Sequence, residues 1–195
     1  MSYTRDGGRL YRRTVNFTVV DSGNGYGSSM KADQIPVAHT PTGGYGNVFP
    51  APILAGCTEP LVAGAPDLRG TWRVISATRG GQPVPADDRL MSYRERIEQC
   101  GNRIVDCGGG TIADARADGT EENGVHDVSV FDFTTPIHVI ASYEEGVFVL
   151  RPVGLPGIEV RRWLDADGHM IWTRPDMGGI RVVLEREPTS STEGN

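Results

Sequence analysis

Short runs of β-forming residues, separated by turn residues at intervals of about 8 to 12, fill the chain from Trp72 to Glu187. The dipeptide Gly101-Asn102 between two such runs favours a two-residue hairpin turn. No stretch carries a sustained apolar period of 3.6 residues, so the crossover helices that join parallel strands are not predicted. The sequence therefore predicts an all-β, antiparallel domain.

The candidate strands have the lengths found in small barrels, and short links join them. They cover residues 71–78, 92–100, 103–107, 111–116, 125–133, 137–143, 147–152, 158–164, 169–174 and 180–186. A meander of about eight to ten strands closes into an up-and-down barrel or curls into a sandwich, and we expect the barrel.

The chain divides by composition into three parts. Residues 1–66 are predicted to be an irregular, Gly/Pro-rich N-terminal arm, residues 67–187 the barrel and residues 188–195 a disordered tail. Within the arm, apolar and polar residues alternate over 9–20, which predicts one strand there. Such a strand would act as a lid or would complete the barrel of a homodimer, and the alternative is a loosely tethered tail.

Charge and hydropathy exclude two classes of partner. The net charge is −6, and Arg12-Arg13 and Arg161-Arg162 are the only basic pairs, so no nucleic-acid partner is expected. No window approaches the roughly 18 apolar residues of a membrane-spanning helix. Lys31 is the sole lysine among 19 basic residues, which is typical of a GC-rich bacterial genome.

The three cysteines do not form a paired pattern. A hairpin around Gly101-Asn102 places Cys100 opposite Arg103 and Cys107 opposite Arg96, so these two sulfurs do not face each other. We therefore expect reduced, structural cysteines and a cytoplasmic protein.

Leu54-Ala55-Gly56-Cys57 matches the box that precedes lipid attachment in bacterial lipoproteins. Such a box follows an apolar segment of about 7 to 15 residues. The preceding residues 43–52 are rich in glycine and proline and cannot form that segment, so lipid attachment at Cys57 is not expected.

Gly70-Thr71-Trp72 at the first barrel strand, with Arg181 or Arg186 in the last, resembles the lipocalins and the wider calycin superfamily. The resemblance implies that Trp72 has a structural role, closing the floor of the barrel and stacking on the late arginine. No signal peptide, disulfide or C-terminal helix of the kind found in secreted lipocalins is predicted from this sequence. Intracellular relatives, such as fatty-acid-binding proteins and heme-binding nitrobindin-like barrels, therefore fit better, although Arg73-Val74-Ile75-Ser76 replaces the Gly/Glu repeat of the latter.

A barrel of this size holds one small ligand, so polar residues in the later strands are candidates for its site. His126 and His138 stand near the starts of two adjacent predicted strands, with Asp127 and Asp132 close by. A histidine beside a carboxylate could exchange protons with a substrate, or a single histidine could bind heme iron. The alternative is a pair of rim histidines bonded to loop backbone.

Two arginines and two aromatic residues complete the candidate ligand site. Arg162 shares a strand face with Val160 and Leu164, and an arginine among apolar neighbours must meet a carboxylate of the ligand or of the protein. Arg181 is the second candidate for an inward arginine, and Tyr143 and Trp172 could clamp a ring. Neither a metal nor an essential cofactor is predicted, because the 118–124 loop lacks a calcium-binding pattern.

Three functions follow from these candidates. The first is a cytoplasmic lipocalin-like protein that binds a small, partly hydrophobic ligand, with Arg162 or Arg181 orienting its polar end. The second is a small barrel enzyme of the cyclase or isomerase type, in which His126 or His138 works with a carboxylate. The third is a heme-binding barrel.

Overall fold

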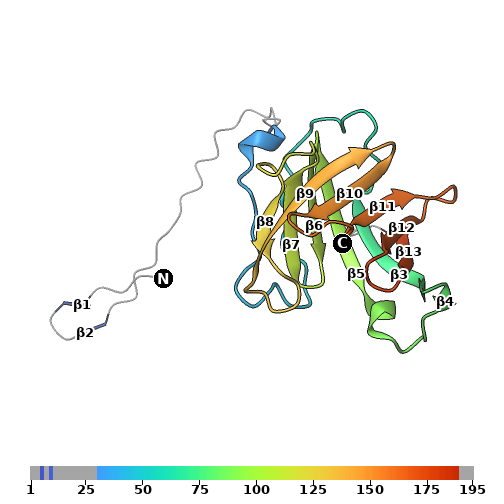
Figure 1. Ribbon diagram of the computed structural model, residues 1–195. Helices are drawn as coiled ribbons and strands as arrows, with labels where there is room; N and C mark the ends of the chain where they lie inside the picture. Colours follow the sequence, from blue (N-terminus) through green and yellow to red (C-terminus); the bar gives the residue numbers. More distant parts are fainter. Residues whose placement is uncertain (1–4, 7–8, 11–29, 189–195) are drawn as a thin grey trace, which may run out of the picture.

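A computed structural model describes residues 5–6, 9–10 and 30–188 of the chain (Figure 1). Within these ranges the fold is all-β, and the two helical segments are single 3-10 turns, η1 (Ala32–Gln34) and η2 (Arg89–Ser92). The strands are β1 (Arg5–Asp6), β2 (Arg9–Leu10), β3 (Gly70–Arg79), β4 (Gln82–Pro83), β5 (Arg94–Cys100), β6 (Arg103–Gly108), β7 (Thr111–Arg116), β8 (Val125–Val128), β9 (Pro136–Glu144), β10 (Val147–Pro152), β11 (Val160–Leu164), β12 (Met170–Arg174) and β13 (Ile180–Arg186).

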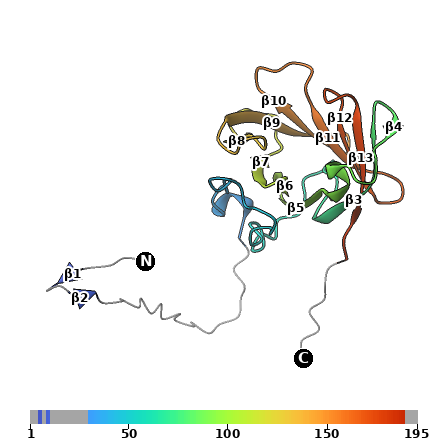
Figure 2. The same cartoon turned by 90° about the horizontal axis from the view of Figure 1, so that it is seen from below.

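One antiparallel sheet forms a nearly closed barrel. The order of strands in this sheet is β7-β6-β5-β3-β13-β12-β11-β10-β9-β8, and β4 pairs with β3. Strand β3, the first long strand in the sequence, therefore lies beside β13, the last one. Figure 2 shows these strands following one another around a ring. The ring is interrupted between β7 and β8, where Gly119 N–H, beyond β7, donates to the Ala141 carbonyl of β9 at 2.9 Å. The predicted up-and-down barrel is confirmed.

Most predicted strands agree with the structure to within two residues, but the expected strand 125–133 is too long. Strand β8 ends at Val128. The Asp132 Oδ1 atom accepts hydrogen bonds from the backbone of Thr134 and Thr135, both at 2.9 Å. An aspartate that bonds the backbone ahead of it stabilises a turn rather than a strand.

Trp72 closes one end of the barrel, as the resemblance to calycins implies. It is fully buried, and its Nε1–H donates to the Leu68 carbonyl at 2.8 Å. The late arginine is Arg186, whose guanidinium lies 4.8 Å from the centre of the indole ring. Gly70 has φ +131°, and a Cβ there would lie 3.2 Å from the Arg186 side chain. The glycine therefore gives the backbone its conformation and leaves room for the stacked arginine.

Residues 30–66, which the sequence predicts as an irregular arm, lie along the outside of the barrel (Figure 1). They cover the outer faces of β5, β6 and β7. A buried cluster, which we call the outer core, joins the two layers and consists of Ala32, Leu54, Cys100, Val105, Cys107 and Ile112. The barrel thus has an apolar interior and, on one side, a second apolar layer outside.

A buried ion pair, which we call the outer clamp, fixes the arm to the barrel. Arg103 Nε and Nη2 donate to the two carboxylate oxygens of Asp114 at 2.8 and 2.7 Å. The remaining Arg103 donors reach the carbonyls of Ala32, Ile35 and Pro36 at 2.6–2.8 Å. Every N–H of this guanidinium therefore has a partner.

Thr40 bridges the interruption in the barrel. Its Oγ1 accepts a hydrogen bond from Ile112 N–H of β7 at 2.9 Å and donates to Asp127 of β8 at 3.0 Å. The arm therefore joins the two strand edges that the sheet leaves unpaired.

The prediction of three reduced cysteines is wrong for two of them. Cys57 of the arm and Cys100 of β5 form a disulfide, whereas Cys107 is free and buried. The predicted hairpin register is confirmed, because Cys100 lies opposite Arg103 and Cys107 opposite Arg96. The disulfide occupies the sulfur that lipid attachment at Cys57 would need. It also removes one reason for a cytoplasmic location, because structural disulfides are typical of oxidising compartments.

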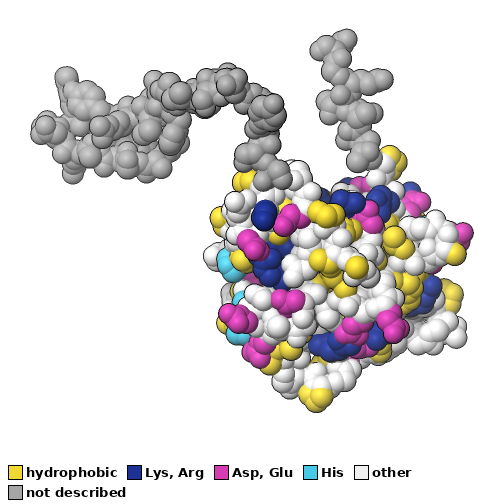
Figure 3. Space-filling model, turned by 90° about the horizontal axis from the view of Figure 1, so that it is seen from above, with side chains coloured by type: hydrophobic (Ala, Val, Ile, Leu, Met, Phe, Trp, Pro, Cys, Tyr) yellow, Lys and Arg dark blue, Asp and Glu magenta, His cyan; other side chains and the backbone are white. Residues whose placement is uncertain are grey.

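Several expectations fall outside the described residues. Arg9 and Leu10 form β2 and pair with β1, but residues 11–20 of the predicted strand, and most of the predicted tail, are not described. Dimerisation through the arm therefore stays a prediction. Among the described helices, none is long and apolar enough to cross a membrane. On the end of the molecule seen in Figure 3, acidic and basic side chains are interspersed.

Candidate functional site

A charged cluster lies inside the barrel, among the apolar side chains of its core. Arg162 of β11 is 4% exposed, and its Nη2 donates to Glu95 Oε2 at 2.9 Å and to Asp106 Oδ2 at 2.6 Å. Tyr93 donates its hydroxyl proton to Glu95 at 3.0 Å, and its ring stacks on Trp172 with centroids 6.2 Å apart. We call these five residues the inner cluster.

Strand alternation brings the inner cluster together. Successive side chains of a strand point to opposite faces, so Arg162 points inward with Val160 and Leu164. Glu95 on β5 and Asp106 on β6 point inward from strands that do not neighbour β11 in the sheet. The ion pairs therefore cross the interior of the barrel instead of linking adjacent strands.

A glycine on β6 makes room for the cluster. A Cβ atom at Gly108 would lie 2.2 Å from the Tyr93 hydroxyl oxygen. Any larger residue at this position would displace the tyrosine and break its hydrogen bond to Glu95.

The charges of the inner cluster do not balance. One guanidinium faces two carboxylates, which leaves one negative charge in excess when both are ionised. Burial raises the pKa of Asp106 to about 7, the Arg162 charge opposes this rise, and the Glu95 charge adds to it. Burial and the Glu95 charge also hold the pKa of Tyr93 well above its usual range, so the phenol stays neutral.

Three buried polar atoms of the cluster have no protein partner. They are Arg162 Nη1, Asp106 Oδ1 and Trp172 Nε1. Arg162 and Trp172 lie directly opposite each other on β11 and β12, and Asp106 contacts Arg162. Buried polar groups in native proteins are nearly always hydrogen-bonded, so these three atoms mark the inner cluster as an incompletely bonded part of the barrel interior.

A cavity of about 710 Å³ opens beside this cluster, at the end of the barrel opposite Trp72. Tyr93 and Trp172 form part of its wall and thus separate it from the ion pairs. The remaining wall comes from the arm and from the loops at the open end: Gly43, Tyr45, Gly46, Asn47, Phe49, Arg79, Arg89, Leu90, Ser92, Arg94, Gly109, Gly110, Phe133, Met177 and Ile180.

Two further cavities lie outside the barrel. One of about 740 Å³ runs between residues 52–57 and strands β3 and β5, but the arginines that line it are paired, Arg94 with Glu187 and Arg96 with Glu98. The other, of about 260 Å³, lies between the arm and the β7–β8 edges. Neither has a pair of stacked aromatic rings in its wall, as the open end does.

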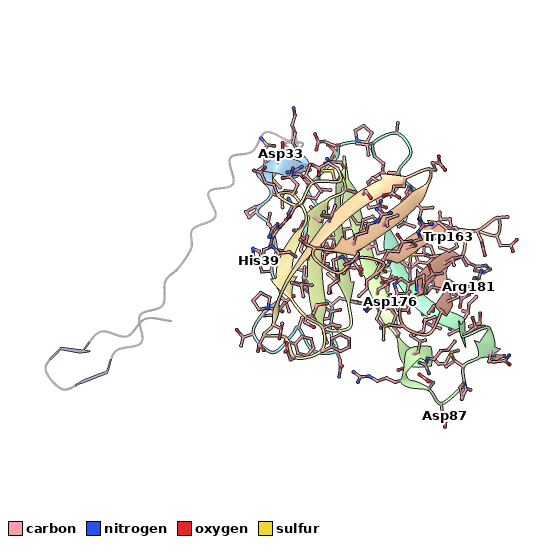
Figure 4. All side chains as sticks on the ribbon, in the orientation of Figure 1. Asp33, His39, Asp87, Trp163, Asp176 and Arg181 are labelled. Atoms are coloured by element: carbon pink, nitrogen blue, oxygen red, sulfur yellow. A yellow bond between two sulfur atoms is a disulfide. The ribbon has the colours of Figure 1, made fainter. Side chains whose placement is uncertain are left out.

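The predicted ligand residues separate into three groups. Arg162 and Trp172 belong to the inner cluster. Tyr143 points inward at the floor, where its hydroxyl accepts a hydrogen bond from Gln99 at 2.9 Å and burial raises its pKa to about 12. The alternative that Arg181 points inward is wrong, because its side chain is exposed on the face opposite Ile180 and Val182 (Figure 4).

The histidines lie outside the barrel interior. His126 and His138 are exposed cross-strand neighbours whose ring centroids are 4.6 Å apart, and His126 Nε2 lies 2.7 Å from the Glu121 carbonyl oxygen. His39 is exposed on the arm (Figure 4), and His169 belongs to the turn before β12. An acid–base pair of His126 or His138 with a carboxylate in the cavity is therefore wrong. The same placement leaves none of the four histidines inside the barrel to serve as the single axial ligand expected for heme iron.

The sequence did not single out Tyr93, Glu95 or Asp106. The sequence did carry one indication of these residues, because the predicted strand 92–100 has no apolar face. Glu95 and Gln99 share one face of this strand, and Arg96 and Glu98 share the other. Both faces of β5 are in fact buried, one in the barrel and one beneath the arm, and each carries charges that pair there.

No protein-family model and no curated protein matches the chain. Among solved structures, the chain is similar to one titled "Human cRBP IV", with 14% sequence identity and a TM-score of 0.42. The match covers 62% of this chain and 98% of that one. The strand order and the stacking of Arg186 on Trp72 give the fold its calycin-like character.

Proposed function

We propose that this protein binds a small, partly apolar molecule at the open end of the barrel. The observation that carries the proposal is a cavity of about 710 Å³ at the open end, whose wall includes the stacked rings of Tyr93 and Trp172.

The shape and lining of the cavity support this proposal. Ligand cavities commonly measure about 300–1,000 Å³ and combine an apolar wall with a few polar groups that orient the ligand. Here Leu90, Met177 and Ile180 supply apolar wall, and the stacked rings of Tyr93 and Trp172 offer a surface for a planar group. The ligand body would lie among these residues.

Native mass spectrometry of the full-length protein, purified without denaturation, tests the proposal. A ligand carried through purification adds a discrete mass that organic solvent removes. For protein without such an adduct, titration with 2-naphthol followed by tryptophan fluorescence provides a second measurement. An unliganded mass together with no saturable fluorescence change would contradict binding.

A matched pair of variants locates the site. Trp172→Phe removes one unpartnered N–H at the cavity, whereas Trp163→Phe changes the outward-facing tryptophan of the adjacent strand (Figure 4). We expect Trp172→Phe to weaken 2-naphthol binding by about tenfold, because the smaller ring removes part of the stacked aromatic wall. Trp163→Phe should bind like the wild type, and equal losses in both variants would place the probe elsewhere.

A further inference from the structure

The charged side chains that line the cavity at the open end are all of one sign. Arg79, Arg89 and Arg94 line it, and no other charged or histidine side chain of the described residues does. The chain as a whole has 25 acidic residues against 19 basic ones and a net charge of −6. A wall with arginine as its only charged residue is therefore a local exception in an acidic protein, and it attracts ligands of negative charge.

The three arginines differ in how far the protein neutralises them. Arg94 donates two hydrogen bonds to the carboxylate of Glu187. Arg79 approaches Asp88 only to 3.8 Å, and its side chain is exposed. The Arg89 guanidinium is also exposed, and it has no hydrogen-bond or ion-pair partner within the part of the chain that the structure describes. Arg89 can therefore bind a ligand without breaking a bond of the protein.

These arginines stand beside an aromatic wall, formed by the stacked rings of Tyr93 and Trp172. Arg89 lies on η2, just before Tyr93 in the sequence, and Arg94 follows Tyr93 directly. An aromatic face packs well against a flat ring, and a guanidinium binds a carboxylate through two parallel hydrogen bonds. The cavity thus combines a surface for a planar group with a donor for an anionic one.

Carboxylates that adjoin the cavity in sequence are engaged elsewhere or lie outside it. Asp132 accepts from the backbone N–H of Thr135 at 2.9 Å, and Asp176 pairs with Arg174 at 3.2 Å. Asp87 stands at the tip of its loop, away from the barrel (Figure 4). The carboxylates of the inner cluster do not line the cavity, because the aromatic wall separates them from it. No carboxylate of the described residues therefore offsets the arginines within the lining itself.

We propose that the open-end cavity selects a planar aromatic anion, such as an aromatic carboxylate, over the uncharged compound of the same shape. The ring would pack on Tyr93 and Trp172, and the anionic group would lie at Arg89, with Arg79 adding to the positive potential. This inference rests on the proposed function, since it names the ligand class of the same cavity.

Three probes of one skeleton test the proposal by isothermal titration calorimetry on the full-length protein. They are 2-naphthoate, 2-naphthamide and 2-naphthylmethylammonium, which are anionic, neutral and cationic at pH of about 7.5. In about 20 mM salt we expect 2-naphthoate to bind about fivefold more tightly than 2-naphthamide and the cation to bind most weakly. In about 0.5 M salt the advantage of 2-naphthoate should fall to about twofold, because exposed charges are screened.

A matched pair of variants assigns the preference to the cavity. Arg89→Gln should bring 2-naphthoate to within about twofold of 2-naphthamide and leave the affinity of 2-naphthamide unchanged. Arg181→Gln removes the same charge from an exposed arginine that does not line the cavity, so it should keep the wild-type order. Urea unfolding checks that both variants are folded, and Arg79→Gln, with a smaller expected loss, provides a second variant in the lining.

The outcomes separate this inference from the proposed function. If none of the probes binds and no adduct is seen by mass spectrometry, ligand binding itself is contradicted. If 2-naphthamide or the cation binds as tightly as 2-naphthoate, the cavity binds ligands but does not select anions. If Arg181→Gln lowers the affinity for 2-naphthoate as much as Arg89→Gln does, the preference comes from the overall charge of the protein, and its assignment to Arg89 is wrong.

Discussion

Two arginines are almost wholly buried in this small barrel, and they differ in how completely they are bonded. Arg103 of the outer clamp is 2% exposed, faces one carboxylate and uses every N–H on Asp114 or on arm carbonyls. Asp114 in turn accepts from Ala38 N–H at 2.8 Å. Charge and hydrogen bonds both balance at this site.

Arg162 of the inner cluster is 4% exposed but faces two carboxylates and leaves Nη1 unbonded. Asp106 likewise keeps one oxygen without a partner. An unpaired buried polar atom costs about 1–3 kcal/mol, so the inner cluster makes the fold less stable than a fully paired arrangement would. The difference teaches that the outer clamp has the complete bonding of a structural ion pair, whereas the inner cluster keeps an excess negative charge and three unbonded polar atoms.

Breaking the outer clamp should have the largest effect on stability. Arg103→Met leaves Asp114 charged and buried and removes the partner of three arm carbonyls. Removing one partner of a buried ion pair typically costs about 3–5 kcal/mol of unfolding free energy. Urea unfolding measures this loss, and Arg181→Met, which changes an exposed arginine, should stay within about 0.5 kcal/mol of the wild type. A loss below about 1 kcal/mol in Arg103→Met would contradict the structural role of the outer clamp.

The disulfide supports the same outer layer, and its removal should have the next largest effect. Cys57 and Cys100 are separated by 43 residues, and closing such a loop typically stabilises a domain by about 2–4 kcal/mol. We expect the double substitution of both cysteines by serine to lose this amount in urea unfolding. A reducing agent should destabilise the wild type similarly and leave the variant unchanged. Equal midpoints with and without reductant in the wild type would show that the bond is absent in solution.

The contrast between the two arginines also shows which features of the fold and of the site can be predicted from the sequence. Alternation in 158–164 predicts correctly that Arg162 shares a face with Val160 and Leu164, and the Gly-x-Trp pattern leads to the Trp72–Arg186 stack. These features depend on period-2 geometry or on a local motif, which neighbouring residues specify. The strand order follows from link lengths in the same way.

The partners of Arg162 could not be predicted, because they cross the barrel from β5 and β6 and depend on closure of the whole sheet. The disulfide was missed for a related reason: Cys57 lies in irregular chain, where no period places it against Cys100. The histidines were wrongly predicted to face the cavity, because β8 has only four residues. A strand this short does not show which of its faces points into the barrel.

The inner cluster should reveal its excess charge in the pH dependence of stability. The folded-state pKa of Asp106, about 7, lies above its ordinary value of 3.8, so the folded protein binds the proton more tightly than the unfolded chain. Its stabilising contribution is complete below pH of about 4 and is lost as the pH rises to about 7, with a slope of at most about 1.4 kcal/mol per pH unit. Urea unfolding across this range should show that slope in the wild type and a flatter one in Asp106→Asn. Other titrating groups are common to both proteins, so matching slopes would show that Asp106 is ionised throughout.

The smallest expected effect concerns Thr40, whose hydroxyl bridges the interruption between β7 and β8 and is fully hydrogen-bonded. Thr40→Val keeps the shape of the side chain but removes the acceptor of Ile112 N–H and a donor to Asp127. Because its hydroxyl is fully partnered, we expect a loss of about 1–2 kcal/mol in unfolding free energy. Trp172→Phe removes an unpartnered N–H, so its cost should not exceed that of Trp163→Phe in the same assay. If Thr40→Val costs nothing while Trp172→Phe is the more damaging substitution, complete bonding does not distinguish the structural outer layer from the inner cluster.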